Sequence, residues 1–499
     1  MDKKTLIKLV INPIEAKGGK AYFVGGCVRD ELLHKEPHDY DIVSNFTPEQ
    51  LHIVFGKFSN ESTNAEKFGV TMPIINGEEI EIATFRKDLT KGRHPEVSLE
   101  ASIEEDAARR DFTINALYED KDGNILDPTG LGLTDIKQYN LRFVGSAKER
   151  LLEDPLRAYR FVRFLAKGFH LVYSDLELME ISDKLDFSEV SKERKLKEIK
   201  KIFSSKYFTP FSDANKAASL LGVYSDMGLK KIFDDMAETP QSFKWHAEGS
   251  LVEDTTTGKK HRGEKVKDFS NMRPLLNGNV FDHTRNVWDK MNHILFHEDK
   301  EFDEEKRFLL TLSAILHDIG KPYCLGWKYN TWKWGDIEHK ETVPDVSKHD
   351  VVGIDYAKRF CKNIGMSNEE IDFVCTMVGE HMKAHRLTLH KHKFDILEFV
   401  HKPLFNEIML VSKADDLGSI STVYNDMPSY DEIMNDPRVK ECINTPMPKP
   451  ILTGDILIEH GLKPSPLFKK MLRVAYKHQY ERGETDKEKL FNFIKNIKE

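Results

Sequence analysis

The sequence lacks any long uninterrupted apolar run. No stretch of about 18 apolar residues occurs among its 499 residues, so no membrane-spanning helix and no membrane partner is expected. The N-terminal stretch MDKKTLIKLVINP begins basic, but Lys8 interrupts its short apolar segment and no small-residue cleavage site follows. These features predict no secretory signal and a cytoplasmic location.

Cysteine is also scarce, with five scattered residues and no CxxC pair. This pattern fits reduced thiols and argues against a disulfide framework or a thiolate zinc site. The net charge of −8 disfavours a protein whose only task is to bind nucleic acid. No internal repeat at solenoid periods is present, and the length predicts two to four domains.

The order of secondary-structure signals changes near residue 150. Before it, strand-like and helix-like segments alternate, and residues 69–75 and 78–86 predict a hairpin across Asn76-Gly77. Beyond it, strand signals fade and a helical period dominates. Residues 250–278 are polar and without periodicity, which predicts an inserted loop. Helices are expected at 153–167, 191–204, 305–317, 350–364 and 368–382.

Two acids stand close together in the strand-like stretch HDYDIVSN. Residues i and i+2 of a strand point to the same face, so Asp39 and Asp41 would lie side by side. Unpaired carboxylates repel each other, and a divalent cation removes that cost. Two Mg²⁺ ions held this way can stabilise the attacking and leaving oxygens of a phosphoryl transfer. The alternative is a pair of exposed acids near a turn.

The stretch YFVGGCVRDELL lies just upstream of these acids. Gly25 and Gly26 allow close approach of a ligand to the backbone and precede a helix N-terminus, which attracts phosphate. Arg29 in the first turn can add charge-assisted bonds to a triphosphate. The alternative role of Arg29 is an ion pair with Asp30 or Glu31 within the same helix.

These stretches together resemble the head of the class II tRNA nucleotidyltransferase / poly(A) polymerase family, within the polymerase-beta-like nucleotidyltransferases. The likeness continues with Leu131 in place of a usual glycine and Phe161 in place of a usual small residue. The further matching segments are EIATFRKDL, RRDFTINALYED, ILDPTGLGLTDI, LLEDPLRAYRFVRFLAKGF and VSKERKLKEIKKIF. The resemblance implies an α+β fold, in which a head with a mixed sheet plus helices is followed by an all-α neck and body.

The resemblance also implies residue roles in the head. Asp39 and Asp41 would be catalytic and bind Mg²⁺. Glu81 is a possible third carboxylate, or one partner of a cross-strand pair. The cluster around Arg109 could instead be a salt-bridge network at a helix end. The nucleotide-binding residues would be Gly26, Arg29, Arg109, Asp111, Asn115, Asp154, Arg157, Arg160 and Arg163.

Base selection is expected at Asp154 and Arg157. If both lie on one helix, their spacing of three places them on one face. A carboxylate accepts from the exocyclic amine of cytosine or adenine, and a guanidinium donates to ring acceptors of the same bases. Guanine and uracil present the reverse pattern and would be rejected. The alternative is an ordinary ion pair along a helix.

A second group of acids and histidines lies further along the chain. A His-Asp dipeptide ends an apolar helix and is followed by a glycine near the C-cap, in the stretch LTLSAILHDIGKP. Imidazoles with carboxylates suit a divalent ion. The segments resemble an HD-type metal-dependent phosphohydrolase domain binding Mg²⁺, Ni²⁺ or Mn²⁺. The implied ligands are His283, His317, Asp318 and Asp415, with His349 and His381 as ligands of a two-metal variant.

We therefore predict four parts: a nucleotidyltransferase head at 1–140, a helical RNA- and nucleotide-binding neck at 141–240, an HD domain at 241–425 and a helical tail at 426–499. The expected activity is template-independent addition or repair of the 3′-terminal CCA of tRNA from CTP and ATP, with phosphatase or phosphodiesterase activity in the HD domain. Alternatives are a poly(A) polymerase, an enzyme adding only CC or only A, and a phosphohydrolase whose head only binds tRNA. The sequence does not predict the oligomeric state.

Overall fold

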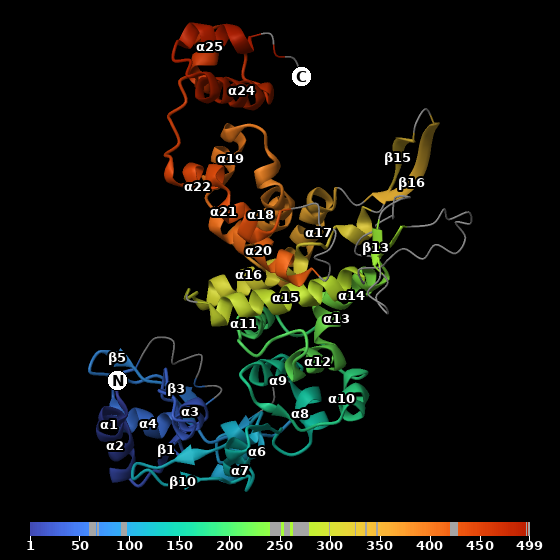
Figure 1. The fold of residues 1–499 in the computed structure, drawn as a ribbon. Coiled ribbons are helices and arrows are strands. Elements are labelled where there is room, and N and C mark those ends of the chain that lie inside the picture. The colour runs from blue at the N-terminus through green and yellow to red at the C-terminus, as the bar shows by residue number, and fades with distance from the viewer. Residues whose placement is uncertain are drawn as a thin grey trace. The chain divides into compact units, whose positions relative to one another are not determined.

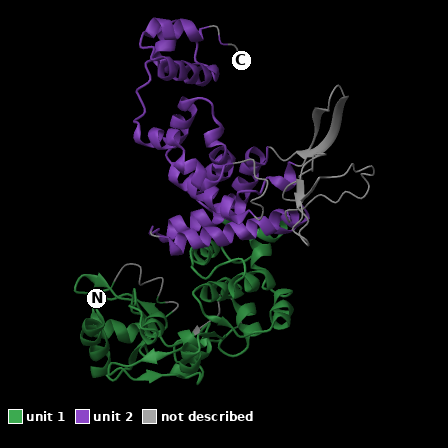
Figure 2. Cartoon of the chain, viewed as in Figure 1, with its two compact units in different colours: residues 1–231, 363–365 green, residues 232–362, 366–499 purple. Residues whose placement is uncertain are grey.

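The computed structural model divides the chain into two compact units (Figure 2). The first comprises Met1–Lys231 with Asn363–Gly365, and the second Ile232–Lys362 with Met366–Glu499. The finer boundaries at residues 140, 240 and 425 stay predictions. No described helix is both long and apolar enough to cross a bilayer. The structure describes all residues except 59–65, 67–68, 91–96, 240–250, 254–259, 263–278, 299, 325, 335–336, 346–347, 420–427, 496 and 498–499.

A mixed sheet forms the centre of the first part of unit 1 (Figure 1). Its strand order is β10-β9-β1-β2-β6-β3. Only the β2–β6 pair is parallel, and every other pair of this sheet is antiparallel. The six strands are β1 (Ala21–Val24), β2 (Ile42–Ser44), β3 (Val70–Thr71), β6 (Ile82–Thr84), β9 (Tyr118–Glu119) and β10 (Ile125–Leu126). This sheet with its helices confirms the predicted α+β class.

Short helices and two small strand pairs surround the sheet. Thr47 caps α4 in a capping box, as its position before Pro48 predicts. Asn76 and Gly77 both have positive φ, 53° and 87°, which fits the predicted two-residue hairpin turn. The elements are α1 (Lys3–Leu6), the π-helix η1 (Ile7–Ile11), α2 (Asn12–Ala16), α3 (Gly26–Leu32), α4 (Pro48–Phe55), β4 (Ile74–Ile75), β5 (Glu78–Glu79), β7 (Lys87–Asp88), β8 (Val97–Ser98), α6 (Ile103–Ala108), the 3₁₀ helix η3 (Thr113–Asn115) and α7 (Gly132–Lys137).

The rest of unit 1 is helical, with one correction to the sequence reading. The single helix predicted at 153–167 is two helices, because Asp154 is extended at φ −141° and ψ 101°. Pro155 follows it, and a proline disfavours the helical conformation of the residue before it. The elements are β11 (Asn140–Leu141), α8 (Ala147–Glu153), α9 (Leu156–Ala166), β12 (His170–Leu171), α10 (Asp175–Ser182), α11 (Lys192–Phe203), α12 (Asp213–Leu220) and α13 (Val223–Met227), with α14 (Leu229–Glu238) running across the unit boundary.

Unit 2 is built mainly from helices. Helix α15 packs against α16 and α20, and α18 packs against the same two helices. This four-helix contact places the His and Asp segments together. The helices are α15 (Val280–His297), α16 (Glu304–Leu316), η5 (Lys321–Tyr323), α17 (His349–Ile364), α18 (Asn368–His385), η6 (Leu387–Leu389), α19 (Lys393–Val400), α20 (Phe405–Gly418), α21 (Tyr430–Asn435), α22 (Pro437–Asn444), α23 (Gly454–Glu459), α24 (Leu467–Arg482) and α25 (Lys487–Ile494).

Two antiparallel strand pairs in unit 2 were not predicted. β15 (Gly326–Trp334) pairs with β16 (Ile337–Asp345), where the helical reading placed no strand. β13 (Leu251–Glu253) pairs with β14 (Lys260–Arg262) inside the predicted loop 250–278. The remainder of that predicted loop lies outside the described residues.

Candidate active sites

The strand register places three acids at one end of two neighbouring strands. Asp39 and Asp41 lie in the extended segment just before β2, so the strand begins later than predicted. The backbone N–H of Val24 donates to the carbonyl oxygen of Asp41 over 3.0 Å, which continues the pairing with β1. Ile42 pairs with Ile82 in the parallel β2–β6 register. Asp41 and Glu81 thus each directly precede the first paired residue of these strands, and the charge of Asp39 acts on both.

The charges of these acids act on one another. Desolvation and the charge of Asp39 raise the pKa of Asp41, although its side chain is partly exposed. The charges of Arg110 and Arg29 oppose this shift. The pKa of Glu81 is raised by desolvation and by both aspartates. Their oxygens do not form a group of three within 4.8 Å. A cation between them would relieve the shared repulsion.

The turn from β1 into α3 faces this group of acids. Gly25 caps the helix at φ 77° and ψ −120°, a conformation open to glycine alone. A Cβ on Gly25 would lie 3.8 Å from both Asp41 Oδ2 and Arg110 Nη1. A Cβ on Gly26 would lie 3.7 Å from Arg29 Nη2. The turn therefore brings open backbone between the acids and two guanidinium groups.

Arg29 and Asp111 are joined through Asn115. Arg29 Nη1 donates to Asn115 Oδ1 over 2.7 Å, and Asn115 Nδ2 donates to Asp111 Oδ1 over 3.0 Å. Arg29 Nε also donates to Asp30 over 2.8 Å, so the alternative helix pair is present as well. Arg160 Nε donates to Asp111 Oδ2 over 2.8 Å. Burial alone would raise the pKa of Asp111, but the charge of Arg160 and these hydrogen bonds lower it to about 2.

Arg109 and Arg110 both bind an acid that the sequence reading missed. Asp106 is fully buried on α6 and lies 2.6 Å from Arg109 Nη2 and 2.9 Å from Arg110 Nη2. Tyr118 Oη donates to the same carboxylate over 2.7 Å. Here the structure contains the salt-bridge network that was the alternative for Arg109. The sequence indicates this network by its spacing, because Asp106 stands three residues before Arg109 and four before Arg110.

Asp154 and Arg157 do not share a helix face, because the chain breaks between α8 and α9. Asp154 Oδ1 accepts from the N–H of Leu156 over 3.2 Å. Arg157 Nη1 donates to Glu153 over 2.9 Å, and Arg157 Nη2 donates to the carbonyl of Arg109 over 2.9 Å. The argument from helical spacing was therefore wrong, although both side chains remain at one junction.

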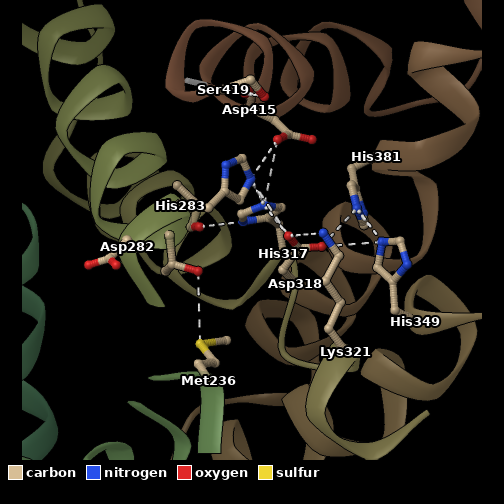
Figure 3. A network of polar contacts seen from close by, with 12 residues as sticks. Met236, Asp282, His283, His317, Asp318, Lys321, His349, His381, Asp415 and Ser419 are labelled. Carbon is tan, nitrogen blue, oxygen red and sulfur yellow. Dashed lines mark hydrogen bonds and ion pairs between the residues drawn. The ribbon is translucent and has the colours of Figure 1, made fainter. Parts of the chain in front are cut away.

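Unit 2 contains two overlapping groups of potential metal ligands (Figure 3). Both are buried, and both include Asp318. In the first, His317 Nε2 lies 3.2 Å from both Asp318 Oδ2 and His283 Nε2. In the second, His349 Nε2 lies 3.2 Å from Asp318 Oδ1 and from His381 Nε2. The two oxygens of Asp318 thus face different pairs of histidines.

Asp415 completes the first group from α20. Its Oδ1 lies 2.9 Å from His283 Nε2 and 3.7 Å from His317 Nε2. All six ligands predicted for this domain are brought together, from α15, the end of α16, the start of α17, α18 and α20. The groups combine neutral nitrogen and anionic oxygen donors, which suits divalent ions.

Hydrogen bonds to the backbone fix two of these rings. The Nδ1 of His317 donates to the carbonyl of Ala314 over 2.8 Å, and the Nδ1 of His381 donates to that of Val378 over 2.7 Å. In a neutral ring this leaves Nε2 with a lone pair directed into the cluster. Burial and the neighbouring imidazoles lower the pKa of His381 to about 3, so this ring is neutral at physiological pH. The donors therefore fit bound metal ions.

Two residues beside the cluster were missed. Lys321 Nζ lies 2.6 Å from Asp318 Oδ2 and, against the effect of burial, holds the pKa of Asp318 well below its usual range together with His317. His385 Nε2 lies 2.7 Å from Asp415 Oδ2, the oxygen that does not face His283. Spacing could have indicated both residues, because Lys321 stands three residues after Asp318 and His385 stands four residues after His381.

The fold joins an α+β head to a helical domain that contains two groups of potential metal ligands. The poly A polymerase head domain matches residues 21–142, and the HD domain matches residues 280–419. The chain therefore contains one segment similar to the poly A polymerase head domain and one segment similar to the HD domain.

Relatives with known names are similar to part of the chain. The CCA-adding enzymes of Streptococcus pyogenes serotype M5 (strain Manfredo) and Leuconostoc citreum (strain KM20) are 37% and 39% identical to it over 203 residues. These residues are 40% of this chain and 49% of each relative. The chain thus spans about half the length of the curated relatives it matches.

Solved structures share the fold at low sequence identity. The Bacillus stearothermophilus CCA-adding enzyme in complex with CTP has a TM-score of 0.53 at 20% identity, covering 99% of this chain and 98% of that one. The Thermotoga maritima CCA-adding enzyme complexed with tRNA_CCA has a TM-score of 0.53 at 16% identity, covering 99% and 95%.

Proposed function

We propose that this protein adds or repairs the 3′-terminal CCA of tRNA, using CTP and ATP. The observation that carries the proposal is that Asp41 lies beside the turn at Gly25, while the charges of Asp41 and Asp39 act on Glu81. The relatives' names point to the same reaction, and two structural neighbours are complexes with CTP and with tRNA.

The RNA 3′-hydroxyl attacks the α-phosphorus of the nucleotide, and pyrophosphate leaves. Asp39 and Asp41 would hold Mg²⁺, which stabilises the attacking and leaving oxygens when bound. Glu81 supports the pair as a third carboxylate. Arg29, oriented by Asn115, binds the phosphates, and the N-terminus of α3 adds backbone donors.

Asp154 and Arg157 select the base by the complementary pattern of donors and acceptors. Arg157 is held by Glu153 and by the carbonyl of Arg109, so its guanidinium has little freedom to adapt to a wrong base. Asp111, Arg160 and Arg163 support this side of the nucleotide. Replacing Asp154 or Arg157 by alanine should loosen the preference for C and A, and unchanged selectivity would remove the role.

The HD domain hydrolyses phosphate esters, with His283, His317, Asp318 and Asp415 holding one divalent ion. The two ligand groups that share Asp318 support a second ion at His349 and His381. When bound, such ions polarise the phosphorus and lower the pKa of bound water. This activity would serve to trim damaged 3′ ends before extension.

One pair of variants tests the two activities together. Asp39→Ala should abolish nucleotide incorporation and leave phosphatase activity, whereas His317→Ala should do the opposite. The assay supplies tRNA ending at the discriminator base with each labelled nucleoside triphosphate and sequences the products. Added CCA supports the proposal. A run of A, only CC or only A would identify one of the alternatives, and normal incorporation by Asp39→Ala would refute the metal assignment.

A further inference from the structure

Three cationic side chains surround one aromatic ring in unit 1. The guanidinium carbons of Arg29 and Arg163 lie 5.1 Å and 4.9 Å from the centroid of the Phe164 ring, and Lys167 Nζ lies 5.5 Å from it. Arg29 comes from α3, whereas the other cations belong to the end of α9. Two elements distant in sequence thus concentrate positive charge around Phe164.

The arginines have acidic partners, but the lysine does not. Arg29 pairs with Asp30 at 2.7 Å, and Arg163 pairs with Glu198 at 3.0 Å. No carboxylate in the described part of the chain lies within ion-pair distance of Lys167. The Nε of buried Arg163 also has no hydrogen-bond partner there. The cluster therefore retains donors and positive charge that an anion could satisfy.

The protein surroundings of Lys167 and the neighbouring cations both disfavour its charged form. Desolvation lowers the pKa of this exposed lysine to about 8, reinforced by the charges of Arg29, Arg163 and Lys201, with Asp30 opposing. A bound anion would remove that repulsion.

Arg29 connects the cluster to the carboxylates of the head. Its positive charge acts against the raised pKa of Asp41, and its Nη2 lies 3.7 Å from where a Cβ on Gly26 would stand. The same guanidinium faces the Phe164 ring. A triphosphate whose α-phosphorus lies at the carboxylates would therefore extend past Arg29 toward Lys167.

We propose that Lys167 is a further nucleotide-binding residue, which together with Arg29 and Arg163 binds the β- and γ-phosphates that leave as pyrophosphate. This inference rests on the proposed function of the head and adds the residue that recognises the leaving group. Lys167 contacts neither the base nor the α-phosphorus, so it contributes equally to CTP and ATP.

The test compares three variants of the full chain. Lys167→Ala should raise the KM for CTP and ATP alike by about tenfold, as expected for loss of a charge-assisted bond. The inhibition constant of inorganic pyrophosphate should rise by a similar factor, with the KM for tRNA and the preference for C and A unchanged. Lys167→Arg should restore most of the affinity, and Lys184→Ala, at an exposed lysine of the same unit, should change neither constant.

Other outcomes overturn the inference. A higher KM for tRNA with unchanged pyrophosphate inhibition would mean that Lys167 contacts an RNA phosphate instead. Unchanged constants would mean that it binds no phosphate. Should the wild-type chain incorporate no nucleotide, the proposed function fails. Calorimetric titration with inorganic pyrophosphate would still decide the inference, since Lys167→Ala should bind it about tenfold more weakly than wild type, Lys167→Arg and Lys184→Ala.

Discussion

At the residue scale, each charged side chain is defined by what its individual atoms contact. Asp415 directs Oδ1 to His283 and Oδ2 to His385. Ser412 Oγ lies 3.4 Å from the other ring nitrogen of His385. His385 therefore orients the carboxylate without facing the cluster itself, as residues behind metal ligands commonly do.

Replacing His385 should weaken metal binding. We expect His385→Ala to lower the affinity of unit 2 for Mn²⁺ by about 10- to 100-fold, because Asp415 loses the group that orients it. His385→Gln keeps a donor and should lose less. The measurement is calorimetric titration of the metal-stripped chain, with His293→Ala, at an exposed histidine of α15, as the control. Wild-type affinity in His385→Ala would contradict the positioning role.

Asp111 should make part of the stability of unit 1 depend on pH. Its pKa is about 2 in the folded protein against an ordinary value of 3.8, so its contribution is present above pH 3.8 and lost as the pH falls toward 2. The shift corresponds to about 2 kcal/mol at neutral pH.

Urea unfolding of wild type and Asp111→Asn measures this contribution. The difference between their unfolding free energies should stay constant from pH 7 to pH 5 and shrink by about 1 kcal/mol at pH 3. A difference that does not change down to pH 3 would show that Asp111 is not stabilised as a carboxylate.

At the element scale, local sequence signals predicted most helices and the hairpin turn, because caps, glycines and prolines act on their own neighbours. They did not predict where a helix breaks. The apolar period runs through Asp154 and Pro155, yet the proline prevents the helical conformation at Asp154. The pair β15–β16 was not predicted although GWKYNTWKW is rich in strand-forming residues, because helical periods dominate this half of the sequence.

The break between α8 and α9 should matter for base selection. Pro155→Ala removes the steric block and allows Asp154 to become helical, which changes its position relative to Arg157. We expect discrimination against UTP and GTP to fall by about 3- to 10-fold, equivalent to about 1 kcal/mol.

Steady-state kcat/KM values with all four nucleotides measure this effect. Pro466→Ala, which alters the proline capping α24 in unit 2, is the matched control and should leave selectivity unchanged. If Pro155→Ala discriminates as well as wild type, the break is not what orients the pair.

At the scale of the whole molecule, the sequence predicted which residues meet better than how they meet. The acids of the head and the six ligands of the HD-type domain follow from motifs that each lie in one short segment. The electrostatic coupling of Asp41 and Glu81 and the sharing of Asp318 depend on strand register and helix packing between distant segments. Asp106 and Lys321 contact residues three or four positions away, so their spacing could have indicated them, whereas His385 acts through Asp415 on a distant helix.

The shared carboxylate makes a prediction about the number of bound ions. Because each oxygen of Asp318 faces a different pair of histidines, His349→Ala should bind one metal ion fewer per chain than wild type, whereas Asp318→Asn should lose both. Elemental analysis after reloading the stripped protein with Mn²⁺ and desalting counts the retained ions. Asp39→Ala is the control, because Mg²⁺-type sites keep several waters and release their ions readily on desalting. One retained ion in wild type would mean that only the group of His283, His317, Asp318 and Asp415 is a metal site, and His349 and His381 would then serve to position Asp318. Two retained ions in His349→Ala would mean that His349 is not a ligand of the second ion.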